Sequence, residues 1–211
     1  MSHPATHADP HHSHEAQGVP LEQSTLEGRN KISLFWTFLG AECVLFGTLF
    51  GTYLTLRGNT MGGPTGQELF DIVLVAWATV LLLVSSLTSV LAVQAMHKGK
   101  LGTMQIWLLV TVLLGAGFLG LEIYEFNHYA HESHTFSASA FSTSFYALVG
   151  CHGAHVTFGL GWIITLMLQM FKKGITTVTA PKVFVASLYW HFIDVVWVFI
   201  FTIVYLMGIL G

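Results

Sequence analysis

The sequence predicts an all-α membrane protein with five transmembrane helices. Hydrophobic residues make up 53% of the 211-residue chain and charged residues only 9%, whereas a soluble domain carries about 25% charged residues. Its apolar stretches are continuous and longer than the ~20 residues that a helix needs to cross a bilayer. Strands of a membrane barrel alternate apolar and polar residues over about ten positions. The composition and the uninterrupted runs therefore favour a helical bundle over a barrel.

The chain begins with a polar segment, residues 1–30, that we expect to be a disordered cytoplasmic tail. It lacks the apolar core of a secretory signal peptide. The segment is rich in histidine, which indicates either a solvated tail or weak metal binding. The histidines concerned are His3, His7, His11, His12 and His14. We expect the remaining residues, 31–211, to form a single membrane domain.

Five apolar runs follow, separated by short segments with turn-forming or charged residues. The expected spans cover residues 32–56, 70–96, 101–126, 141–171 and 183–210. A Gly/Pro-rich loop at 57–69 and a basic turn at 97–100 separate the first three spans. A polar loop at 127–137 and a lysine-bearing loop near Pro181 separate the others. The last two runs exceed the minimum length, so these helices are expected to tilt or to protrude.

The lysine and arginine residues predict the orientation. Five spans place the N-terminus, the second loop and the fourth loop on one side of the membrane. That side carries Arg29, Lys31, Lys98, Lys100, Lys172, Lys173 and Lys182, and the other side carries Arg57. Positive residues concentrate on the cytoplasmic side of membrane proteins. We therefore expect a cytoplasmic N-terminus and an external C-terminus, with Lys172 and Lys173 near lipid headgroups by charge attraction.

Ionisable residues within the spans are the candidate functional residues. Such a side chain costs roughly 2.5–3.5 kcal/mol at the centre of a membrane helix, so it needs a functional role or a partner. The set comprises Glu42, Glu122, Glu125, His152, His155, His191 and Asp194. Counting a rise of 1.5 Å per residue from the inner end of each expected span predicts two layers. Glu42, His191 and Asp194 form the inner layer, and the other four residues form the outer layer.

Within the inner layer, Glu42 has only apolar or small neighbours on its own span. Burial disfavours a charged carboxylate, so we expect Glu42 to be protonated or to pair with His191. Together with Asp194, His191 would then be a polar brace that joins the last span to the first. Alternatively, each group is a neutral polar contact between helices, worth about 0.6 kcal/mol.

The same residues also raise the possibility of a metal site. On three expected helices, two ionisable residues lie three positions apart, as do the ligands of di-metal carboxylate bundles. These pairs are Glu122 with Glu125, His152 with His155, and His191 with Asp194. However, the Glu122 pair and the His191 pair differ by roughly 15–20 Å in height, whereas metal–ligand bonds are near 2 Å. Two of the three intramembrane histidines share one helix face, so they cannot clamp a haem from both sides. We therefore expect no metal site, no redox centre and no catalytic residue in this chain.

Small residues mark close helix contacts in membranes. Glycines are frequent in the third and fourth spans, which predicts that these two helices pack tightly. Further glycines, Gly40, Gly47 and Gly51, line the first span.

Four segments resemble motifs of one family, subunit III of the haem–copper oxidases. They are Trp36-Thr-Phe-Leu-Gly-Ala-Glu42-Cys-Val-Leu-Phe46, Leu114-Gly-Ala-Gly-Phe-Leu-Gly-Leu-Glu122-Ile-Tyr-Glu125-Phe126, Gly150-Cys-His152-Gly-Ala-His155-Val156 and Ser187-Leu-Tyr-Trp190-His191-Phe-Ile-Asp194-Val-Val-Trp197. The resemblance covers about residues 25–211 and is closest to the five-helix bacterial form. It implies a helix arrangement in which the first two spans and the last three form separate groups, with a lipid-filled cleft between them.

The resemblance also implies a non-catalytic subunit of a proton-pumping terminal oxidase that reduces oxygen to water. Haem and copper would lie in subunits I and II, and a small subunit IV and bound phospholipid would accompany them. Subunit III would support proton uptake and the stability of subunit I. Glu42 occupies the position of the family's carbodiimide-reactive glutamate. The implied location is the bacterial cell membrane, with no nucleic-acid partner.

The electron donor stays open between two branches of the family. The segments Thr25–Lys31, Leu119–Phe126 and Thr179–Lys182 are most similar to cytochrome c oxidases of Gram-positive type. The His-rich tail and Gly62–Gly66 resemble the quinol oxidase branch. A subunit III-like protein of nitric oxide reductase is a more distant alternative. An independent proton-linked transporter is an alternative of another class, but the apolar gap between the two polar layers argues against a continuous proton path.

Overall fold

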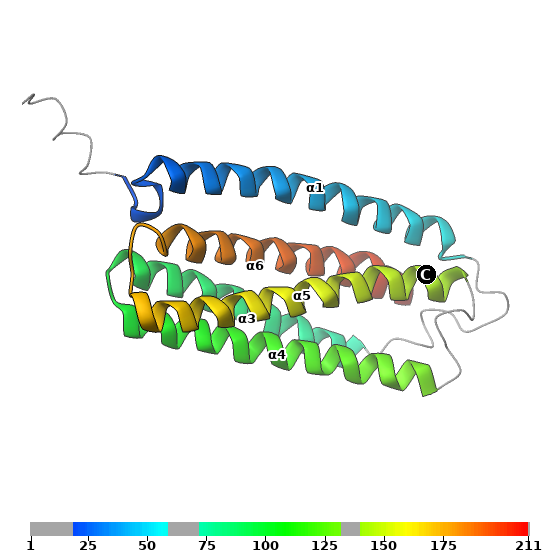
Figure 1. Ribbon diagram of the computed structural model, residues 1–211. Coiled ribbons are helices and arrows are strands. Elements are labelled where there is room, and N and C mark those ends of the chain that lie inside the picture. Colours follow the sequence, from blue (N-terminus) through cyan, green and yellow to red (C-terminus); the bar gives the residue numbers. More distant parts are fainter. Residues whose placement is uncertain (1–18, 59–71, 132–139, 211) are drawn as a thin grey trace, which may run out of the picture.

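The computed structural model describes residues 19–58, 72–131 and 140–210. Within them the protein is a bundle of helices, five of which are long and apolar enough to cross a membrane (Figure 1). These are α1 (Leu26–Leu56), α3 (Ile72–His97), α4 (Leu101–His131), α5 (Ala140–Lys173) and α6 (Ala180–Ile200). A π-helical segment, η3 (Phe201–Leu206), and a short helix, α7 (Met207–Leu210), continue α6. The predicted all-α class with five spans is confirmed.

The start of α1 differs from the expectation. The hydroxyl of Thr25 accepts a hydrogen bond from the backbone N–H of Gly28 at 3.0 Å, which is the pattern of an N-cap. The helix therefore begins at Leu26, six residues before the expected start. A short 3₁₀-helix, η2 (Leu21–Gln23), precedes it. Residues 19–30 are thus folded, whereas the five tail histidines lie outside the described residues.

Helix α6 occupies the centre of the bundle and is the most buried span. It packs against α1, α3 and α5, while α4 packs against α3 and α5, and α1 packs against α5 (Figure 1). The expected grouping of the first two spans against the last three is therefore wrong. The physical reason is that the buried side chains of α1 form a single narrow stripe, and α1 packs with it on α5 and α6. That stripe is Ile32, Leu39, Phe46 and Tyr53.

Close packing around α6 depends on two glycines. A Cβ atom at Gly115 of α4 would lie 2.7 Å from the ring of Trp190, and one at Gly159 of α5 would lie 3.1 Å from the same ring. The indole of Trp190 thus fits between α4 and α5, and the contact between these two glycine-rich helices is confirmed. By contrast, the space around Gly40, Gly47 and Gly51 of α1 is open within the described residues.

One end of the bundle gathers the start of α1, the α3–α4 turn and the α5–α6 loop, while α7 lies at the other end (Figure 1). The turn closes at Gly99, whose φ of 68° favours glycine. The segment that carries η2 is fixed to this turn, because Glu22 Oε2 lies 3.1 Å from His97 Nε2. Only 3% of the Glu22 side chain is exposed. This contact ties the chain before α1 to the end of α3.

Candidate functional site: intramembrane polar groups

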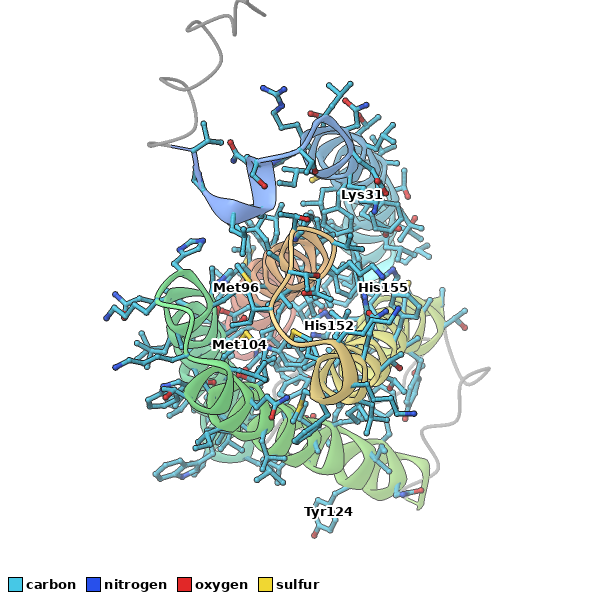
Figure 2. All side chains as sticks on the ribbon, turned by 60° about the vertical axis from the view of Figure 1, so that its left-hand side comes forward. Lys31, Met96, Met104, Tyr124, His152 and His155 are labelled. Atoms are coloured by element: carbon cyan, nitrogen blue, oxygen red, sulfur yellow. The ribbon has the colours of Figure 1, made fainter. Side chains whose placement is uncertain are left out.

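The ionisable residues predicted from the sequence occupy three separate places in the bundle. Glu42 of α1 meets His155 of α5, while His191 of α6 meets α3. Glu122 and His152 are buried between α4, α5 and α6. Figure 2 shows His155 on the side of α5 toward α1 and His152 nearer the middle of the bundle.

The pair of Glu42 and His155 joins α1 to α5. Glu42 Oε2 lies 3.1 Å from His155 Nε2. The other ring nitrogen of His155, Nδ1, lies 2.7 Å from the carbonyl oxygen of Cys151. Because a carbonyl only accepts, Nδ1 must carry a hydrogen, so Nε2 is the atom that shares a proton with Glu42. The pair therefore holds either a carboxylic acid against a neutral imidazole or a carboxylate against an imidazolium.

This geometry corrects the predicted pairing of Glu42 with His191. The prediction measured α1 from residue 32, but the helix begins at Leu26. Counted from Leu26, Glu42 lies about 24 Å along its helix, and His155 lies about 27 Å from Lys173 at the same end of the bundle. The two residues are therefore level. The predicted polar brace between the last span and the first is wrong.

His191 instead belongs to a seam between α3 and α6. Its Nδ1 lies 2.6 Å from Ser86 Oγ, and its Nε2 lies 3.5 Å from Ser187 Oγ. Ser187 in turn lies 2.7 Å from Ser89. Asp194, one turn further along α6, is 7% exposed.

Two tryptophans reinforce this seam. Trp190 donates its indole N–H to Ser85 at 3.0 Å, and Trp197 donates to Thr79 at 3.0 Å. These serine and threonine partners were missed by the sequence reasoning, which considered only ionisable residues. A usable signal was present in the run Ser85-Ser86-Leu-Thr88-Ser89, because several hydroxyls on one span indicate hydrogen bonds between helices.

The third place lies in the core, toward the end of the bundle where α7 lies. Tyr205 of η3 donates its hydroxyl to Glu125 Oε2 at 3.2 Å. The carboxyl group of Glu122 packs over Gly153, where a Cβ atom would lie 2.8 Å from Oε1. His152 is fully buried against the rings of Phe118 and Trp197. Within the described part of the chain, the polar side-chain atoms of Glu122 and His152 have no hydrogen-bond partner.

Among residues 19–58, 72–131 and 140–210, no three His, Cys, Asp or Glu side chains converge as a metal site. Hydrogen bonds of Glu42 and His191 join α1 to α5 and α3 to α6. The site thus defines a class: a multi-pass helical membrane protein with a hydrogen-bonded acid and histidine between two of its spans.

Comparisons with known proteins then identify the family. A sequence model described as cytochrome c oxidase subunit III matches residues 30–209. Cytochrome c oxidase subunit 3 of Bacillus sp. (strain PS3) is 61% identical over 193 residues, which cover 92% of this chain and 93% of that protein. The chain therefore belongs to the subunit III family of the haem–copper oxidases, and it is part of an oxidase complex.

Relatives from two branches of the family are similar to this chain. Cytochrome c oxidase subunit 3 of Bacillus subtilis is 61% identical over 191 residues, covering 90% of this chain and 92% of that protein. Quinol oxidase subunit 3 of Bacillus spizizenii is 51% identical over 201 residues, covering 95% of this chain and 98% of that protein. The similarity extends over nearly the whole chain in both branches.

Proposed function

We propose that this chain is a non-catalytic subunit of a cytochrome c oxidase, which supports proton uptake by subunit I and the stability of that subunit. The observation that carries the proposal is the family match over residues 30–209, together with the acid–histidine pair of Glu42 and His155 that joins α1 to α5. On the basis of membership in the subunit III family, haem and copper are assigned to the partner subunits. The bacterial relatives support a location in the bacterial cell membrane.

Cytochrome c is the proposed electron donor. The identity of 61% to a cytochrome c oxidase subunit, against 51% to a quinol oxidase subunit, supports this choice. The alternative is subunit III of a quinol oxidase. The test is purification of the complex through a tag on this chain in mild detergent. We expect haem-containing subunits I and II to be recovered, with oxidation of reduced cytochrome c. Oxidation of a quinol alone would contradict the donor, and recovery of this chain without haem would contradict the subunit assignment.

Bound phospholipid is proposed at a groove between α1 and the α5–α6 pair, with a volume of about 380 Å³. Lys31 and Lys182 lie at the groove, and aromatic and aliphatic side chains form the rest. The apolar lining residues are Leu34, Phe35, Phe38, Trp162, Pro181 and Val185. Ammonium groups beside an apolar groove fit an anionic headgroup and its acyl chain. Lys172 and Lys173, in the last turn of α5, are proposed to add to the positive charge around this headgroup.

Mass spectrometry of the purified complex tests the lipid proposal. Replacing Lys31 and Lys182 together by glutamine removes both charges at the groove. We expect the amount of copurified anionic phospholipid to fall, whereas Lys100→Gln in the α3–α4 turn leaves it unchanged. An equal lipid content in both variants would argue against the groove.

A further inference from the structure

A pocket with a volume of about 760 Å³ lies at the end of the bundle that holds the α3–α4 turn. Four segments that are distant in the sequence line it: the chain before α1, the end of α3 with its turn, the start of α4 and the α5–α6 loop. The lining residues include Pro20, Leu21, Met96 (labelled in Figure 2), His97, Leu101 and Ile175. Most of these side chains are apolar, so this end pocket can bury an apolar group.

The wall of the end pocket that the chain before α1 forms is held by buried contacts. Glu22 follows the lining residue Leu21, and its two carboxylate oxygens lie 3.2 and 3.1 Å from His97 Nε2. A Cβ atom added at Gly28 of α1 would clash with the backbone carbonyl of Glu22, so the two backbones are in close contact. The wall is therefore fixed before a ligand binds, which lowers the cost of binding.

The charge beside the end pocket is positive. Lys98 and Lys100 flank the lining residue Gly99 in the sequence, and both lysines are exposed. Within the described residues, neither lysine forms an ion pair with a carboxylate. An apolar pocket with unpaired cations beside it fits a ligand that carries both an apolar group and a negative charge.

The position of the end pocket favours a peptide over a lipid. Its helical lining residues lie at helix ends, since α3 ends at His97 and α4 begins at Leu101. By contrast, the groove proposed for phospholipid extends from Lys31 to Phe38 of α1, about 10 Å of helix on which an acyl chain can lie. The end pocket offers no such length along a span. It lies at the level of the connecting segments, where a protein segment outside the membrane can reach it.

We propose that the end pocket is a docking site for another subunit of the oxidase complex. The docked segment is a loop or a chain end that places an apolar side chain in the pocket and an aspartate or glutamate beside Lys98 and Lys100. The inference rests on the proposed role of this chain as an oxidase subunit. The buried apolar side chain supplies affinity, and the lysines set the orientation and the choice of partner.

Photo-crosslinking in the purified complex tests the docking site. The photoreactive residue benzoylphenylalanine is placed at Ile175 or at Leu101, two independent positions in the lining. The matched control position is Val178, which is 54% exposed in the α5–α6 loop but outside the lining. We expect illumination to join both pocket variants, and not the control, to one oxidase subunit. Mass spectrometry should place the crosslink in a segment that contains aspartate or glutamate.

Charge variants separate this site from the lipid groove. Lys98→Gln combined with Lys100→Gln should lower the crosslink yield roughly threefold to tenfold, as expected for the loss of two exposed ion pairs. Lys31→Gln combined with Lys182→Gln, which alters the lipid groove, should leave the yield unchanged.

Several results in a haem-containing complex would overturn the docking site. They are a crosslink from Val178 as strong as those from the pocket, an unchanged yield after loss of Lys98 and Lys100, or no crosslink at all. A crosslink to phospholipid or to a second copy of this chain would equally reject the proposed partner. Failure of the subunit assignment looks different, because the chain would then be recovered without haem-containing subunits.

Discussion

At the scale of single residues, the hydrogen-bond partner and the exposure of Glu42 determine how it can react. Glu42 contacts the one ring nitrogen of His155 that the backbone of Cys151 leaves free. The side chains of His155 and Glu42 keep 20% and 12% of their surface exposed. A reagent dissolved in the lipid phase thus reaches Glu42 more readily than it reaches Glu122, which is 4% exposed.

This exposure leads to a prediction for carbodiimides, which react with protonated carboxyl groups in apolar surroundings. We expect Glu42→Gln to abolish labelling of this chain by an apolar carbodiimide and to leave assembly of the complex intact, because glutamine still hydrogen-bonds His155. Mass spectrometry of the labelled chain measures the effect. Glu122→Gln is the control and should keep the label. Full labelling of the Glu42→Gln variant would show that another carboxyl group reacts.

At the scale of helices, the bundle depends on where small side chains meet large ones. Gly115 is such a place, since an added Cβ atom would lie 2.7 Å from the Trp190 ring and 2.9 Å from Leu160. Trp190 is 1% exposed and is further fixed by its hydrogen bond to Ser85. The ring therefore has little freedom to move aside.

We expect Gly115→Ala to lower the free energy of unfolding by about 1–3 kcal/mol, the usual range for overpacking a core. Gly120→Ala on the same helix meets open space and should instead raise it by about 0.5–1 kcal/mol, because alanine favours the helix. Unfolding of the purified chain by a denaturing detergent compares the two variants. Equal stability of both would contradict the close fit of Trp190.

The segment before α1 gives a second prediction at this scale. Glu22 is buried and bonded to His97, whereas Glu27 pairs with Lys31 on an exposed face of α1. A hydrogen bond to a charged group is worth roughly 1.5–3 kcal/mol, so we expect Glu22→Ala to loosen residues 19–25 markedly. Hydrogen exchange of the backbone amides should rise there.

Glu27→Ala serves as the matched control, because an exposed pair contributes little. Its exchange in residues 19–25 should stay close to that of the wild type. If both variants exchange alike, the contact between Glu22 and His97 does not hold this segment in place.

At the scale of the whole molecule, the helix order fixes which loops share a side of the membrane. The start of α1, the α3–α4 turn and the α5–α6 loop lie at one end of the bundle (Figure 1). The lysines and arginines of the sequence concentrate in these segments, with Arg57 at the other end. From the positive-inside rule we expect this end of the bundle to lie in the cytoplasm.

A labelling experiment tests this orientation. In a background with Cys43→Ser and Cys151→Ser, we expect a membrane-impermeant maleimide to label Arg57→Cys in intact spheroplasts. It should label Lys98→Cys only after the membrane is broken. Labelling of Lys98→Cys alone in intact spheroplasts would reverse the assigned orientation.

The sequence by itself determined the class, the number of spans and the family, because bilayer thickness imposes long apolar runs and because four motifs occur in order. It also identified the ionisable side chains within the spans, whose insertion into a membrane costs free energy. Only the tertiary structure decided which of them meet. Glu42 pairs with His155 rather than His191 because α1 starts at Leu26 and packs on α5 and α6. A shift of six residues is about 9 Å along a helix, more than the reach of any hydrogen bond. Partners across helices therefore depend on helix starts and packing, which apolar runs leave undefined.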